Sequence, residues 1–174
     1  MQTIVVGLIA GTIYALLAAG ITLVYKATRA VNFAQAEIGT LAIYGTWWVS
    51  GKYHHSWWLG ALVALAIGIA ISLLFERLVM RALVTASQIT KTVATIGLLG
   101  LLTGLEARWF AGSAKIFPPP LSKGGVTVAG VRVSPTQELA VGVVAVIALG
   151  LAVFLRRTRF GLAILASADD PVAA

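Results

Sequence analysis

Five long apolar runs, separated by short polar segments, organise the chain. They occupy residues 1–25, 30–50, 57–75, 91–110 and 139–155. A helix needs about 17–25 mostly apolar residues to cross a bilayer, and each run except 91–110 meets that requirement. In that run only 14 residues separate Lys91 from Glu106, so either Lys91 snorkels or Glu106 and Arg108 lie at the outer interface. The pattern predicts an all-α fold, a polytopic transmembrane helix bundle with about five membrane helices in a single domain over residues 1–174.

The second run carries three polar side chains near its start: Asn32, Gln35 and Glu37. Asn32 as N-cap with Gln35 three residues later matches a capping box, which satisfies free N–H groups at a helix start. Alternatively the three residues line a pathway or its gate, since polar groups inside apolar runs often do. A charge at the bilayer centre costs about 2.5–3.5 kcal/mol on insertion scales, so we expect Glu37 near an interface or facing protein.

Aromatic residues flank the short segment 51–56: Trp47, Trp48, Tyr53, Trp57 and Trp58. Tryptophan and tyrosine gather at the headgroup level of membranes, so we expect a tight turn there, on the outer side. An aromatic ligand cage is the alternative interpretation of the same residues.

The longest polar segment, 112–136, is expected to be an extracytoplasmic loop. Its stretch 126–133 alternates like a small β-hairpin. Ser134, Pro135 and Gln137 then predict a helix start, with an N-cap, a proline at the first helical position and a capping-box glutamine.

Composition supports a membrane protein: 59% of the residues are hydrophobic and 11% are charged, with a mean hydropathy of +0.95. Soluble domains carry about a quarter charged residues. The net charge of +7 does not indicate nucleic-acid binding, because the basic residues are scattered between apolar runs. His54 and His55 are adjacent and would not share a helix face, so we expect no metal site. We expect no cofactor either.

The basic residues also predict the orientation, since Lys and Arg favour the cytoplasmic side. Lys26 and Arg29 follow the first run, and Arg156, Arg157 and Arg159 follow the last. The N-terminus is therefore expected to be extracytoplasmic, and residues 156–174 to be cytoplasmic.

Small residues recur at steps of four and predict close helix packing, which membrane helices achieve through such stripes. One stripe contains Gly7 and Gly11, a second contains Gly60 and Gly68, and a third contains Gly100 and Gly104. Glycine is also simply common in membrane helices, which is the competing explanation.

Beyond the arginines, residues 161–166 form an apolar stretch too short to span, which suits a helix on the cytoplasmic surface. Asp169, Asp170 and Pro171 then predict another helix start. Because a start is followed by so few residues, we expect the chain to be the N-terminal part of a longer protein.

Three stretches resemble the branched-chain amino acid ABC transporter permeases, the Liv-type family of integral membrane subunits. They are residues 11–26 (GTIYALLAAGITLVYK), residues 31–38 (VNFAQAEI) and the tail from Arg159 to Ala174. Their order and spacing match the family over the whole chain. Ala36 departs from the pattern, because the family usually has glycine there, and its methyl group puts close packing at that point in doubt.

The resemblance implies a transport subunit of the bacterial inner membrane rather than an enzyme. Its partners would be a second permease subunit, two cytoplasmic ATPase subunits and an extracytoplasmic substrate-binding protein. The sequence has no Gly-x-x-x-x-Gly-Lys-Ser/Thr motif, so ATP hydrolysis would belong to a partner. Gly161, Asp169, Asp170 and Pro171 would then couple the ATPase to the membrane helices, and otherwise this segment is an ordinary helix beside the membrane.

Competing functions remain open at this stage. Related permeases carry urea, short-chain amides or sugars. An ion-coupled secondary transporter often needs a membrane-embedded carboxylate, whereas the acids here fall at expected helix ends or in loops. A membrane scaffold would suit the glycine stripes but not the tail, and no set of catalytic residues converges in the sequence.

Overall fold

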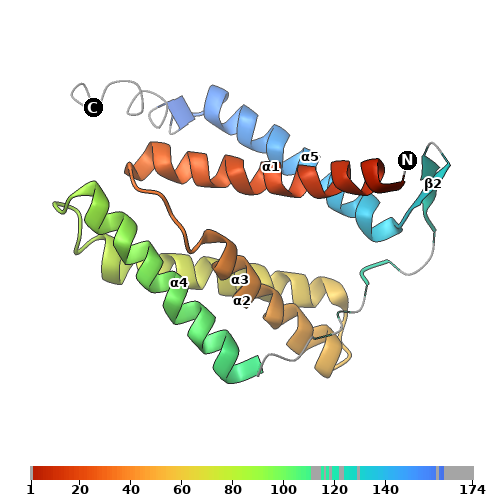
Figure 1. Cartoon of the computed structure of the whole chain (residues 1–174), viewed down its shortest axis with the longest axis horizontal. Coiled ribbons are helices and arrows are strands. Elements are labelled where there is room, and N and C mark those ends of the chain that lie inside the picture. Colours follow the sequence, from red (N-terminus) through yellow and green to blue (C-terminus); the bar gives the residue numbers. More distant parts are fainter. Residues whose placement is uncertain are drawn as a thin grey trace. The chain divides into compact units, whose positions relative to one another are not determined.

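The structure is a computed structural model and describes residues 2–110, 115, 117, 119–121, 124–128, 130–159 and 161–162. Five α-helices lie in these ranges: α1 Gln2–Thr28, α2 Gln35–Thr46, α3 Trp57–Phe75, α4 Gln88–Phe110 and α5 Pro135–Arg157. Two short π-helical segments, η1 Trp47–Lys52 and η2 Glu76–Met80, directly continue α2 and α3. Strands β1 Val126–Val128 and β2 Val131–Val133 form a hairpin (Figure 1).

The predicted all-α, polytopic membrane bundle is confirmed. Among the described residues, four helices are long and apolar enough to cross a membrane: α1, α3 together with η2, α4, and α5. The second expected crossing, over residues 30–50, differs. Its helix α2 begins only at Gln35 and has 12 residues, and η1 then continues it to Lys52.

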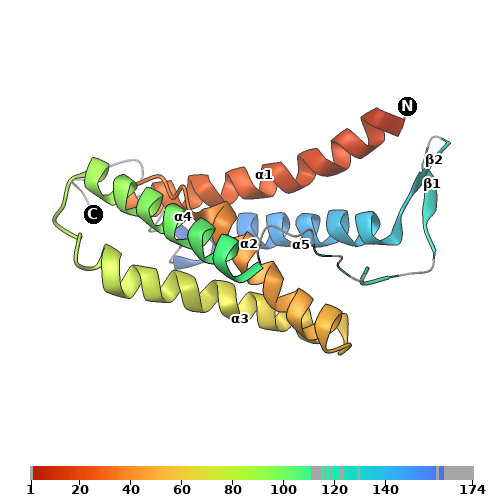
Figure 2. The same cartoon turned by 60° about the horizontal axis from the view of Figure 1, so that its bottom comes forward.

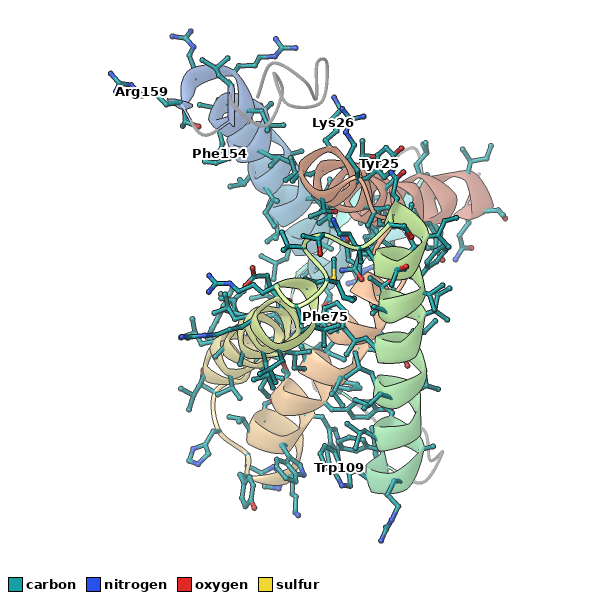
Figure 3. All side chains as sticks on the ribbon, turned by 90° about the vertical axis from the view of Figure 1, so that its left-hand side faces the viewer. Tyr25, Lys26, Phe75, Trp109, Phe154 and Arg159 are labelled. Atoms are coloured by element: carbon teal, nitrogen blue, oxygen red, sulfur yellow. The ribbon has the colours of Figure 1, made fainter. Side chains whose placement is uncertain are left out.

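Contacts within the chain define two units, residues 1–29 with 121–174 and residues 30–120. In the first unit α1 and α5 pack side by side and run in the same direction (Figures 1 and 2). Their C-terminal turns carry Lys26 and the pair Arg156 and Arg157. Figure 3 shows Tyr25 and Lys26 at this end of α1, and Phe154 and Arg159 at this end of α5. Basic residues of both helices therefore gather on one side.

The hairpin and the start of α5 form where the sequence predicts them. Val126 pairs with Val133 in an antiparallel register, and Gly130 in the turn has φ +78°, a conformation that glycine adopts readily. Ser134 caps α5: its hydroxyl accepts from the Gln137 N–H at 3.3 Å, while Gln137 Oε1 accepts from the Ser134 N–H at 2.9 Å. The predicted capping box is confirmed.

Replacing Ser134 with alanine is expected to lower the free energy of unfolding by about 1 kcal/mol, because a free N–H of α5 loses its acceptor. Thermal unfolding of the purified protein in detergent measures the change. Ser72→Ala, at an exposed position inside α3, is the control. Equal melting temperatures for the two variants would show that the cap contributes nothing to stability.

In the second unit α2 lies between α3 and α4 (Figure 3). Ala34 and Ile38 are buried against Leu102 of α4, and Leu41, Ile71, Leu98 and Leu99 surround this small core. At the other end of α2, the Tyr44 ring stacks on Phe110 with 3.7 Å between the ring centroids. α3 runs antiparallel to both neighbours, as the chain trace in Figure 1 shows.

The contact between α2 and α3 is a close approach of two backbones. A Cβ atom on Gly60 would lie 3.1 Å from Thr46 Cα, and one on Gly68 would lie 3.7 Å from Ala42 Cβ. The Thr46 hydroxyl also donates to the Gly60 carbonyl at 3.1 Å. Gly60 and Gly68 thus lie on the face of α3 that meets α2.

Candidate functional site

The chain is not helical between α1 and α2. Arg29 ends α1 with φ +58°, and its N–H donates to the Tyr25 carbonyl at 2.7 Å. This is the left-handed residue that commonly closes a helix, although glycine usually occupies it. Residues 30–34 then lead to Gln35, the first residue of α2. We refer to residues 29–34 as the break.

The predicted capping box at Asn32 is wrong. The N-cap of α2 is Ala34, which makes no side-chain cap. Asn32 Oδ1 instead accepts from the Ala34 N–H at 3.1 Å. Asparagine readily bonds the backbone two residues ahead, which stabilises a turn in place of a helix, so α2 starts two residues later than expected.

Thr95 of α4 holds the break in place. Its side chain is almost completely buried, and its hydroxyl accepts from the Phe33 N–H at 3.2 Å. The same hydroxyl lies 3.0 Å from the Val31 carbonyl and 2.7 Å from the Thr92 carbonyl, to either of which it can donate. Thr95 is seven residues into α4, about 10 Å from the start of that helix. The break therefore packs against α4 about two turns from the start of that helix, and the Thr95 hydroxyl bonds or contacts two of its backbone groups.

Acidic groups of α2 and α4 meet next to the break. Glu37, in the first turn of α2, accepts from the Thr103 hydroxyl at 3.0 Å through Oε1. Its carboxyl group also interacts with that of Glu106, four residues before the end of α4. Glu106 Oε1 is buried and makes no hydrogen bond among the described residues. Two neighbouring carboxyl groups can share a proton or attract a cationic group, because their like charges repel when both are ionised.

The break, the start of α2 and the acidic pair together form the candidate site. Non-helical backbone at membrane depth is tolerated where it is buried in protein or lines a cavity. The start of a helix carries partial positive charge from its dipole, whereas the Glu37 and Glu106 carboxyls supply negative charge. Asn32 lies in the break, and Gln35 and Glu37 lie in the first turn of α2. Their role in a pathway or gate stays a prediction.

Sequence reasoning missed the contribution of α4. Thr95, Thr103 and Glu106 are separated by eight and three residues, which places them along the same side of a helix. A polar strip on an otherwise apolar helix was the available signal for this face, but nothing local indicated that α2 would lie against it.

The end of α5 is built around one threonine. Thr158 ends α5, its hydroxyl accepts from the Gly161 N–H at 3.0 Å, and its carbonyl accepts from the Leu162 N–H at 3.0 Å. Thr158 therefore also caps the following helical turn. Gly161 is buried, and a Cβ there would collide with backbone atoms of Phe154 and Leu155. Asp169, Asp170 and Pro171 lie outside the described residues.

The remaining glycines predicted to pack do not meet another helix among the described residues. A Cβ on Gly7, Gly11, Gly100 or Gly104 would have no atom of the described residues within 4 Å beyond its own helix turn and chain neighbours. Their role in helix packing stays a prediction.

Comparisons with known proteins identify the family. Residues 3–174 match the model of the branched-chain amino acid transport system permease component. A relative from Pseudomonas aeruginosa, the high-affinity branched-chain amino acid transport system permease protein BraD, is 29% identical over 182 residues. That match covers 98% of this chain and 59% of the relative, so the chain spans less than two thirds of the relative's length. No solved structure matches the chain. The chain belongs to the family of permease components of branched-chain amino acid transport systems.

Proposed function

We propose that the chain is a permease subunit of an ABC importer and forms part of the transmembrane pathway for branched-chain amino acids. The family and the Pseudomonas aeruginosa relative support the transport role and the substrate class. The observation that carries a role in the pathway is the non-helical break before α2, held by Thr95 and followed by Glu37, whose carboxyl group interacts with that of Glu106.

The site has the charges that an amino acid zwitterion requires. The start of α2 is the positive end of its helix dipole, which favours a carboxylate, as half-helix ends do in other transporters. The acidic pair, Glu37 in the first turn of α2 and Glu106 on α4, favours an ammonium group. The apolar surroundings of α2 suit an aliphatic side chain. We place Asn32, Gln35 and Glu37 on this pathway or at its gate.

The proposed machine needs partners, which we take from the family. They are a second permease subunit, two cytoplasmic ATPase subunits that hydrolyse ATP, and an extracytoplasmic substrate-binding protein. The subunit lies in the lipid bilayer of the bacterial inner membrane, with the N-terminus outside and residue 174 inside. The coupling segment, residues 156–174 with Gly161, Asp169, Asp170 and Pro171, contacts the ATPase.

Replacing Glu37 with alanine tests the pathway role. We expect leucine uptake to fall by about tenfold or more, because a charge-assisted contact contributes about 1.5–3 kcal/mol. Uptake of labelled leucine into cells that depend on this transporter measures the effect, and co-purification of the ATPase checks assembly. The matched control is Glu76→Ala, which removes an exposed acid that pairs with Arg81 at 3.5 Å. Wild-type uptake by an assembled Glu37→Ala transporter would remove Glu37 from the pathway.

The adjacent carboxyls favour one second candidate, an ion-coupled secondary transporter, because that class uses membrane-embedded carboxylates. The energy source separates the two mechanisms. An ABC importer loses uptake when ATP is depleted and retains it when an ionophore collapses the ion gradient. The opposite result identifies ion coupling. Competition of leucine uptake by urea and acetamide separates the amino acid from the amide substrate class in the same assay.

A further inference from the structure

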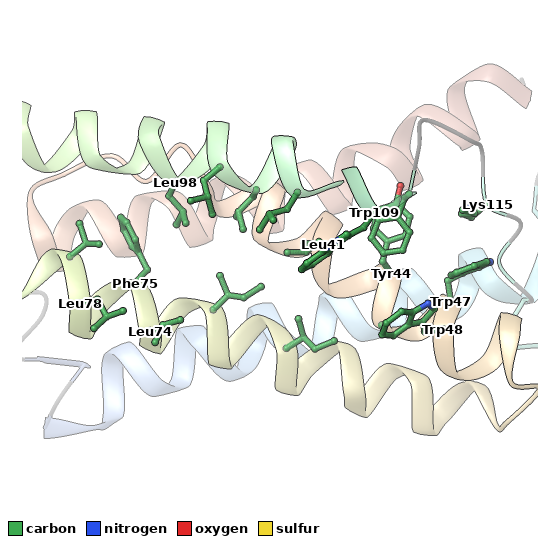
Figure 4. A pocket seen from close by; sticks show the side chains of 18 of the residues that line it. Leu41, Tyr44, Trp47, Trp48, Leu74, Phe75, Leu78, Leu98, Trp109 and Lys115 are labelled. Atoms are coloured by element: carbon green, nitrogen blue, oxygen red, sulfur yellow. The ribbon is translucent and has the colours of Figure 1, made fainter. Parts of the chain in front are cut away.

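An apolar groove runs between α3 and α4 in the unit formed by residues 30–120, with α2 at its floor. Its volume is about 840 Å³, which lies in the range of small-molecule sites. Figure 4 shows the two helices on either side of the groove, and Phe75 points into the space between them in Figures 3 and 4. The walls are aliphatic: Ile67, Ile71 and Leu74 of α3, and Leu98, Leu101 and Leu105 of α4.

The length of the groove matches one leaflet of a bilayer. On one wall the lining residues extend from Ile67 to Val79, and on the other from Leu98 to Phe110. Each row covers twelve residue steps, or about 18 Å at 1.5 Å per residue. The hydrocarbon core of a bilayer is about 30 Å thick, so one leaflet has a thickness similar to this length. An extended acyl chain therefore fits along the groove.

One end of the groove is cationic and aromatic. Lys52 Nζ lies 5.8 Å from the ring centroid of Trp48, and Lys115 Nζ lies 5.0 Å from that of Trp47. All four residues line the groove (Figure 4 labels Trp47, Trp48 and Lys115 at one end, with Phe75 and Leu78 toward the other). Among the described lining residues none is acidic. Tryptophans mark the headgroup level of a membrane, and a lysine ammonium binds phosphate as a point charge.

We propose that this groove binds one anionic phospholipid, with an acyl chain between α3 and α4 and the headgroup phosphate at Lys52 and Lys115. Charge selects the ligand, since a zwitterionic lipid carries its own cation next to the phosphate. The apolar walls and their length fit the chain, and the tryptophans lie where its glycerol ester region would be. The same groove filled by another apolar helix would leave the two cations without a complementary charge from that helix.

Native mass spectrometry of the purified transporter tests the proposal with phosphatidylglycerol and phosphatidylcholine as probes. The wild-type protein is expected to retain phosphatidylglycerol in preference. The double variant Lys52→Gln/Lys115→Gln should lose that preference, by roughly fivefold for each lysine. Lys52→Arg/Lys115→Arg should keep it, because the positive charges remain. Lys26→Gln is the matched control, since it removes a lysine at a helix end that does not line the groove.

A second measurement identifies the occupant directly. A photoreactive phenylalanine analogue at position 101 is expected to cross-link to lipid in native membranes, because Leu101 is largely exposed and lines the groove. Cross-linking to a polypeptide would overturn the proposal, and so would equal retention of the two lipids by the wild-type protein. Neither measurement depends on uptake. A negative result would therefore contradict the lipid site without contradicting the proposed transport function.

Discussion

Thr95→Val is expected to destabilise the protein by about 1–3 kcal/mol, because it leaves a buried polar group without its partner. Valine has nearly the shape of threonine but has no hydroxyl. The Phe33 N–H would lose its acceptor, which is the hydroxyl of an almost completely buried side chain. We also expect leucine uptake to fall, since the break would no longer be held against α4. Thermal unfolding of the purified protein and uptake by cells measure the two effects.

Two control variants isolate the hydroxyl. Thr95→Ser retains it and should restore most of the stability and uptake. Thr40→Val removes a hydroxyl that bonds only the Ala36 carbonyl of its own helix, at an exposed position, and should change stability little. If Thr95→Val and Thr40→Val change stability and uptake equally, the break does not depend on the Thr95 hydroxyl, and Thr95 has no part in the candidate site.

Elements defined by local chemistry were predictable from the sequence. The third run, 57–75, coincides with α3, and Ser134, Pro135 and Gln137 form the cap that their order predicts. The hairpin pairs as its alternation indicates. In each case the residues that determine the structure are within a few positions of one another. Their conformational preferences can therefore be read without knowing the tertiary packing.

The candidate site depends on contacts that are distant in sequence. The local sequence allows Asn32 to cap a helix or to stabilise a turn. In the structure it stabilises a turn, and the Phe33 N–H donates to the Thr95 hydroxyl. Thr95 is more than sixty residues further along the chain. Glu37 and Glu106 likewise meet only through the packing of α2 on α4. Periodicity reveals the polar face of α4, but not the helix that covers it.

The glycine stripes show the same limit. Gly60 and Gly68 lie against α2. Gly7 and Gly11 belong to a stripe with the same four-residue step, but a Cβ on either would meet no other helix within 4 Å among the described residues. A stripe of small residues allows another helix backbone to approach closely, but residues elsewhere in the fold determine which helix packs there. In α3 the complementary surface includes Thr46, whose hydroxyl binds the Gly60 carbonyl.

Gly161→Val is expected to lower coupled uptake strongly while the ATPase remains bound. A side chain at this buried position would collide with the Phe154 carbonyl and Leu155 Cα, which are backbone atoms that cannot move aside as a flexible side chain does. Overpacking of this kind costs about 1–3 kcal/mol. The turn capped by Thr158 should therefore open and displace the segment that we propose contacts the ATPase. We expect uptake to fall by about tenfold or more, which corresponds to about 1.4 kcal/mol of lost coupling.

The measurement compares uptake with ATP hydrolysis by the purified transporter in the presence of its binding protein. Gly150→Val is the matched control, because a Cβ at that position of α5 meets no described atom within 4 Å. Loss of uptake with continued hydrolysis for Gly161→Val, but not for Gly150→Val, identifies a coupling role. Loss of both activities together with lower melting temperature indicates that the turn only stabilises the fold. The distinction is sharp because a coupling defect changes the ratio of transport to hydrolysis, whereas a folding defect reduces both in proportion to the amount of intact protein.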